Sequence, residues 1–159
     1  MQTKEFWINF LQFTGLVRIG NTFKDLWFYI AILLGPIFYF CLSLFIAPHI
    51  TLKNPIIFLS SQFFLVSFPE EFFFRGFLIP YLRLEFKLNY SLLGISLANI
   101  IAAIFFALLH LFFHPFYWAI STFFPAIIFG YFREKHDSLW PALLLHFIYN
   151  TGYFILFGK

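Results

Sequence analysis

Two adjacent carboxylates, Glu70 and Glu71, lie in an otherwise apolar stretch that also contains Arg75. If the chain is helical from Pro69 on, Glu71 and Arg75 share a face, in the favourable order for an ion pair. Glu70 is rotated from Glu71 by roughly 100° around the helix, so its charge is less compensated. Such a carboxylate in a low-dielectric place suits general acid/base catalysis. The simpler interpretation is that both glutamates mark the watery end of a membrane span.

Polar side chains interrupt two further apolar segments. His110 is followed four residues later by His114, on the same helical face. His146 is followed at the same spacing by Asn150. Ionisable groups inside spans cost about 2.5–3.5 kcal/mol each on insertion scales, so they usually mark function. Each group alone is more often a hydrogen-bonded packing residue, but three such sites on three predicted spans indicate one wet cavity inside a bundle.

A glutamate, two histidines and an asparagine together allow hydrolysis of a peptide bond. Glu70 can take a proton from water that a histidine helps to hold, while the other histidine and Asn150 donate hydrogen bonds to a developing oxyanion. A serine nucleophile is less favoured, because no Gly-x-Ser-x-Gly motif is present. A metal site with Glu70, His110 and His146 as ligands is the alternative, although the His-Glu-x-x-His motif is absent.

Composition indicates the elements that must hold these residues. Of the 159 residues, 62% are hydrophobic and 11% charged, whereas a soluble domain has about a quarter charged residues. The sequence therefore predicts one small membrane domain, with the lipid bilayer as its surroundings. Nucleic acid is not expected as a partner, because the basic residues are scattered and form no patch. The single cysteine, Cys41, excludes an intrachain disulfide.

The apolar segments predict an all-α polytopic helix bundle with about five transmembrane spans. Residues 1–24 are expected to form an N-terminal interfacial, amphipathic segment. Residues 25–159 are expected to form the membrane-embedded core, with the polar motifs within 67–150. The expected spans are Trp27–Pro48, Pro55–Leu82, two within Leu88–Phe132 that turn near His114-Pro115, and Leu139–Gly158.

Prolines and charged residues mark the breaks in this pattern. Pro69 and Pro80 predict a bent or broken second span. The residues from Arg83 to Lys87 and from Arg133 to Asp137 are expected to be charged loops.

Most basic residues fall on one side of the membrane if the N-terminus is cytoplasmic. Those on the cytoplasmic side are Lys4, Arg18, Lys24, Arg83, Lys87, Arg133 and Lys135, and those outside are Lys53 and Lys159. This bias predicts an integral membrane protein with its N-terminus in the cytoplasm, and the expected location is the bacterial inner membrane.

Three motifs occur in order on separate predicted spans: Glu70-Glu71-x-x-x-Arg75, Phe106-x-x-x-His110 and His146-x-x-x-Asn150. Their combination resembles the CAAX protease and bacteriocin-processing (CPBP, or Abi) family of glutamic-type intramembrane endopeptidases. The resemblance covers residues 55–157, about two thirds of the chain. The chain is shorter than many members, which have eight or so spans.

The resemblance implies roles for these residues. Glu70 and His110 would activate the water, and His146 and Asn150 would stabilise the oxyanion. Glu71 and Arg75 would shape the site. The resemblance assigns no role to His114, and the glutamic mechanism requires neither a metal ligand set nor another cofactor.

The expected substrate is a membrane-anchored protein or peptide, with a CAAX-like tail, a bacteriocin leader and a C-terminal sorting tail all open. The oligomeric state is also open. Alternatives from other classes are a non-catalytic immunity or scaffold protein of the same fold, and a small ion or proton transporter. The absence of inverted half-repeats disfavours the transporter.

If all the helices were straight, the motif residues would not lie at the same depth in the membrane. At 1.5 Å per residue, Glu70 and His146 both fall in the inner half of the membrane, but His110, counted from Ser91, falls near the outer face. Three arrangements would remove this mismatch. The third helix could start below the membrane surface, the turn at His114-Pro115 could lie inside the membrane, or Pro69 could break the second span.

Overall fold

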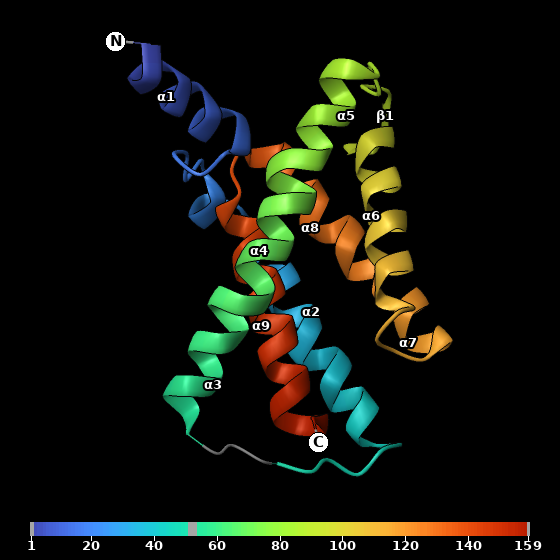
Figure 1. Cartoon of the computed structure of the whole chain (residues 1–159). Coiled ribbons are helices and arrows are strands. Elements are labelled where there is room, and N and C mark those ends of the chain that lie inside the picture. The colour runs from blue at the N-terminus through green and yellow to red at the C-terminus, as the bar shows by residue number, and fades with distance from the viewer. Residues whose placement is uncertain (1, 51–53, 159) are drawn as a thin grey trace.

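The computed structural model describes residues 2–50 and 54–158. The chain is mostly helical, with one short antiparallel hairpin (Figure 1). The elements in chain order are α1 (Gln2–Thr14), η1 (Thr22–Lys24), α2 (Leu26–Ser43), α3 (Pro55–Ser61), η2 (Gln62–Ser67), α4 (Phe68–Glu71), η3 (Phe72–Leu78), α5 (Ile79–Glu85), β1 (Ser91–Leu92), β2 (Ile95–Ser96), α6 (Leu97–His110), α7 (Phe116–Ser121), α8 (Phe123–His136) and α9 (Trp140–Phe157). The predicted all-α class is confirmed.

The segment from α3 to α5 is one helical run, residues 55–85, drawn in green in Figure 1. Two of its stretches, η2 and η3, are π-helical turns. Each ends two residues before a proline, at Pro69 and Pro80. Proline lacks an N–H and its ring clashes with the carbonyl four residues earlier, so a widened turn lets the helix continue. The sequence predicted a bent or broken helix here, and the structure has a continuous helix with two widened turns.

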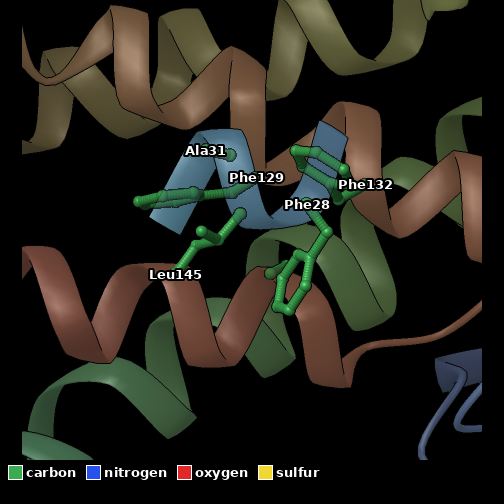
Figure 2. Packing of buried hydrophobic residues seen from close by; sticks show 6 residues of the cluster. Phe28, Ala31, Phe129, Phe132 and Leu145 are labelled. Atoms are coloured by element: carbon green, nitrogen blue, oxygen red, sulfur yellow. The ribbon is translucent and has the colours of Figure 1, made fainter. Parts of the chain in front are cut away.

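The core beside the predicted site is formed where α2, α8 and α9 meet (Figure 2). The Phe28 and Phe132 rings meet edge to face, with centroids 5.6 Å apart. The buried members of this cluster are Phe28, Ala31, Phe129, Phe132, Ala142 and Leu145. Since Leu145 is fully buried here, the rotation of α9 about its axis is fixed at the position directly before His146.

Two tyrosine hydrogen bonds also join α2 to α9. The Tyr39 hydroxyl donates to the Tyr149 carbonyl over 2.6 Å, and the Tyr149 hydroxyl donates to the Ala31 carbonyl over 2.5 Å. A Cβ atom at Gly35 would lie 2.6 Å from the Tyr149 ring, so this close approach requires glycine.

Helices α6 and α8 also approach each other closely, as α2 and α9 do at Gly35. The amide of Asn99, fully buried on α6, donates to the Ile127 carbonyl of α8 over 3.1 Å. A Cβ at Gly130 would collide with the Asn99 side chain. Strands β1 and β2 precede α6, and Ser96 caps it by accepting a hydrogen bond from the Asn99 N–H over 3.0 Å. The hairpin thus occupies residues that the sequence assigned to a third span.

The N-terminal segment is held by the last turns of α8 and the first residue of α9. The buried Arg133 guanidinium donates to the Phe13 carbonyl over 3.1 Å and to the Arg75 carbonyl over 3.0 Å. The Trp140 indole N–H donates to the Leu16 carbonyl over 2.9 Å. Helix α1 is therefore anchored to the rest of the fold, and its position at a membrane interface stays a prediction.

The predicted loop from Arg133 to Asp137 is wrong, because α8 continues to His136, and Asp137, with a left-handed φ of 47°, is its C-cap. Basic side chains in a last turn interact favourably with the helix dipole. Contacts with Asp25 add to this stabilisation: Lys135 Nζ forms an ion pair with Asp25 Oδ2 at 2.6 Å, and His136 Nε2 lies within hydrogen-bonding distance of the same oxygen, at 3.0 Å. The other predicted loop, at Arg83, is likewise helical until α5 ends at Glu85.

Two helices of the described chain are long and apolar enough to cross a membrane, Leu26–Ser43 and Pro55–Glu85. Helix α6 is apolar but shorter. The segment expected to form the fourth span is divided at Thr122 into α7 and α8. Large apolar side chains are exposed on most helices, as lipid contact requires. The count of about five spans therefore stays a prediction.

Candidate active site

Three helical segments carry the predicted site residues. The run of residues 55–85 carries the glutamates and the arginine, α6 ends at the first histidine, and α9 carries the second histidine and the asparagine. Their order on the helices matches the predicted distribution over separate elements. The six residues are Glu70, Glu71, Arg75, His110, His146 and Asn150.

Glu71 and Arg75 form a buried ion pair, as their spacing predicts. Arg75 Nη1 donates to Glu71 Oε1 over 2.8 Å, and the two side chains are 0% and 1% exposed. Arg75 also donates to the Ala126 carbonyl over 3.0 Å and lies over the Phe106 ring, 4.7 Å from its centroid. Since both charges are buried, loss of one partner would leave the other uncompensated.

His146 connects this ion pair to Glu70. Its Nδ1 lies 2.7 Å from Glu71 Oε1, and because a carboxylate beside Arg75 accepts hydrogen bonds, Nδ1–H is the donor. The His146 ring also stacks on Phe129, with centroids 5.3 Å apart and planes 16° apart. These contacts orient the ring so that Nε2 faces Glu70 Oε2 at 3.8 Å.

Glu70 differs from Glu71 in its surroundings. Its side chain is 34% exposed, whereas that of Glu71 is fully buried. Within the described residues, Glu70 Oε2 is a buried atom without a hydrogen-bond partner. Glu70 is therefore the carboxylate that can reach a water or substrate, while Oε1 of Glu71 accepts from both Arg75 and His146.

His110 adjoins the cluster through an aromatic ring. Its Nδ1–H donates to the Phe106 carbonyl over 2.8 Å, which leaves Nε2 of the neutral ring as an acceptor. The Phe106 ring lies 4.5 Å from the His110 ring and 5.9 Å from the His146 ring, measured between centroids. The His114 ring stacks on the His110 ring, with centroids 5.8 Å apart.

The structure brings together four of the six predicted residues by direct contact: Glu70, Glu71, Arg75 and His146. In the described part of the chain, His110 makes no direct polar contact with Glu70. Asn150 lies one turn after His146 on α9, half-buried, and its side chain forms no hydrogen bond with the described residues.

Two buried residues beside the site have no role in the sequence-based interpretation. Ser67, fully buried, lies one turn before Glu71, and its hydroxyl has no partner within residues 2–50 and 54–158. Arg133 holds the carbonyl of Arg75 from α8. Ser67 begins the polar motif in the sequence, but a serine among phenylalanines carries no specific signal. Arg133 was assigned to a loop by its charge.

Candidate metal ligands do not gather here. Among the residues that the structure describes, no three histidine, cysteine, aspartate or glutamate side chains form a group that could hold a metal ion. The requirement for a metal is therefore a question for solution experiments.

A comparison with protein families identifies one match. The model of the family described as "Type II CAAX prenyl endopeptidase Rce1-like" matches residues 52–152, a range that contains all six predicted site residues. No curated protein and no solved structure matches the chain. The match covers well over half of the 159 residues and confirms the resemblance seen in the motifs. The chain belongs to the Rce1-like family, a membrane-embedded family of CAAX endopeptidases.

Proposed function

We propose that the protein is a glutamic-type intramembrane endopeptidase that hydrolyses a peptide bond of a membrane-associated protein. One observation carries this proposal. An unpaired, partly exposed carboxylate, Glu70, faces a histidine that a buried Glu71–Arg75 pair holds in orientation. This arrangement combines a group that can accept a proton with a group that can donate a hydrogen bond beside it.

The hydrolytic step follows from these positions. Glu70 accepts a proton from a water molecule, whose oxygen attacks the carbonyl carbon of the substrate peptide bond. His110, with Nε2 free to accept, helps to hold that water. The carbonyl oxygen becomes an oxyanion, the peptide C–N bond then breaks, and Glu70 returns the proton to the departing amine. No covalent enzyme intermediate forms.

The oxyanion is assigned to His146 and Asn150. Asn150 has its side-chain amide available on the turn of α9 that follows His146. His146 donates Nδ1–H to Glu71, so a second donation from Nε2 requires the imidazolium form.

The proposed substrate is a membrane-anchored protein with a CAAX-like or C-terminal sorting tail. The family match supports a CAAX-type tail, and the exposed apolar surface supports a substrate that reaches the site from the bilayer. The proposed location is a bacterial inner membrane, with the N-terminus in the cytoplasm.

The substrate is identified by comparing cells that carry the wild type with cells that carry Glu70→Ala. Terminal peptides of membrane and exported proteins are quantified by mass spectrometry at matched levels of the two enzymes. A precursor that stays uncleaved only in the variant supports the proposal and names the substrate. Identical profiles would contradict it and favour a non-catalytic immunity or scaffold role.

A further inference from the structure

Buried polar atoms without partners are concentrated in one place. Within the described residues, six buried side-chain oxygens lack a hydrogen bond. Five of them belong to two neighbouring helices, the 55–85 run and α9, and the sixth belongs to Asn99 between α6 and α8. The five are Gln62 Oε1, Ser67 Oγ, Glu70 Oε2, Glu71 Oε2 and Thr151 Oγ1.

Their spacing places Gln62, Ser67 and Glu71 along one side of the helix. Gln62 and Ser67 are five residues apart across the π-helical turn η2, where residues at that spacing are one turn apart. Ser67 and Glu71 are four apart across α4, again one turn. The widened turn before Pro69 thus aligns polar residues that a regular helix would rotate away from one another.

Helix α9 faces this polar side. His146 bonds to Glu71, and the ring of Phe147 meets that of Phe63 with centroids 5.6 Å apart. Gln62 directly precedes Phe63, and Thr151 lies one turn beyond Phe147. The two helices therefore run in opposite directions along the same seam, and Thr151 follows by one turn the Phe147 ring that lies in it.

An unsatisfied polar atom in a protein interior costs on the order of 1–3 kcal/mol, so buried polar groups are normally hydrogen-bonded to protein or to ordered water. In a membrane, bulk water cannot relieve this cost. Ser67 and Glu71 are both 0% exposed, which makes their unused oxygens the clearest case. Bound water explains most simply why such atoms cluster beside a site that would consume water.

We propose that a hydrated track runs between the 55–85 helix and α9, with walls formed by Gln62, Ser67, Glu71 and Thr151, and that it brings water to Glu70. The hydration itself is independent of the proposed function, whereas the delivery of hydrolytic water rests on it. Ser67 is in this account a positioning residue, because its hydroxyl holds a water against Glu71.

The hydration is tested in lipid bilayers by solid-state NMR, with polarisation transferred from mobile water to labelled serine, threonine and alanine side chains. The Ser67 and Thr151 signals, identified by their loss in Ser67→Ala and Thr151→Val, are expected to build up several times faster than those of the buried Ala102 and Ala142. Equal build-up at Ser67, Thr151 and these alanines would overturn the track.

The delivery is tested with the same variants. Ser67→Ala is expected to lower kcat on the order of tenfold with KM unchanged, the effect of losing about one buried hydrogen bond. The control is Ser61→Ala on the same helix, since its hydroxyl donates to the Phe58 carbonyl over 2.8 Å and faces no unpartnered atom of the track. Thr151→Val, which keeps the side-chain volume, repeats the test if Ser67→Ala folds poorly.

The outcomes separate the two proposals. A hydrated track with kcat unchanged in both Ser67→Ala and Thr151→Val overturns the delivery of water. A hydrated track in a protein without hydrolytic activity leaves the track standing and refutes the proposed function. In the Ser67→Ala variant, the transfer from water is measured at the Thr151 signal. If this transfer is unchanged and the variant is more thermally stable than wild type, the Ser67 hydroxyl binds no water and the track is overturned.

Discussion

His146 donates a 2.7 Å hydrogen bond from Nδ1 to Glu71, whose carboxylate is at the same time paired with a buried arginine. The bond fixes the orientation of the imidazole ring as well as its position. The two adjacent glutamates therefore have different surroundings: one holds the histidine, and the other faces it across 3.8 Å.

Loss of the buried ion pair is expected to destabilise the fold strongly when only one partner changes. Glu71→Gln leaves the Arg75 guanidinium uncompensated and is expected to lower the free energy of unfolding by about 3–5 kcal/mol. The double variant Glu71→Gln/Arg75→Met is expected to lose less, because no charge is left alone. Thermal unfolding in detergent, followed by circular dichroism, measures both.

The matched control is the surface pair of Arg18 with Asp137, whose side chains are 52% and 55% exposed. Arg18→Met is expected to change the free energy of unfolding by less than about 1 kcal/mol. A loss as large as that of Glu71→Gln would mean that burial does not determine the strength of these pairs.

Asn150→Ala is expected to lower kcat by about a hundredfold or more with little change in KM, because an oxyanion donor acts mainly on the transition state. Steady-state kinetics on the processed peptide measures this. Asn9→Ala, at an exposed position of α1, provides the same substitution away from the site and is expected to have wild-type kinetics. An increase in KM alone would assign Asn150 to substrate binding instead.

The Asp25 ion pairs are expected to make stability depend on pH. Burial raises the pKa of Asp25, but hydrogen bonds from Lys135, the Trp27 N–H and His136 outweigh it, so the pKa lies below its ordinary value. A carboxyl with a lowered pKa contributes its stabilisation above the unfolded-state value and loses it as pH falls through the folded-state value.

Asp25→Asn isolates this contribution, because asparagine can still accept the helix-capping hydrogen bond from Trp27. The variant is expected to be less stable than wild type by about 1 kcal/mol at pH 7, and the difference is expected to shrink below about pH 4. Midpoints of thermal unfolding between pH 7 and pH 3 test this. A difference that stays constant over that range would contradict the assignment.

Prolonged dialysis against a chelator is expected to leave hydrolysis unchanged, because the proposed mechanism uses only side chains of the chain and a water molecule. The rate of cleavage of the processed peptide before and after dialysis measures this. A loss of activity that added Zn²⁺ restores would instead support Glu70, His110 and His146 as metal ligands.

The sequence predicted the local part of the site well. The spacing of Glu71 and Arg75 defines their pairing within one helix, and the order of the motifs places them on three helical segments. The partner of His146 could not be predicted, because it depends on the rotation of α9, which the packing of Leu145 against α2 and α8 sets.

Irregular backbone explains the other differences. The prolines indicated a disturbed helix, but only tertiary packing decides between a break and the π-helical turns observed. The predicted depth of His110 was counted from Ser91, whereas Ser91–Ser96 contains the hairpin and α6 begins at Leu97. This shortens the helical path to His110 by about 9 Å at 1.5 Å per residue.

The central claim is that Glu70 activates the hydrolytic water, and Glu70→Gln tests it most directly. The variant keeps the shape of the side chain and removes its ability to accept a proton. Purified wild type and variant, reconstituted in lipid bilayers and shown to unfold at the same temperature, are compared in a single turnover of the processed peptide. The account predicts a loss of at least about a hundredfold in the cleavage rate. Cleavage at the wild-type rate would contradict it.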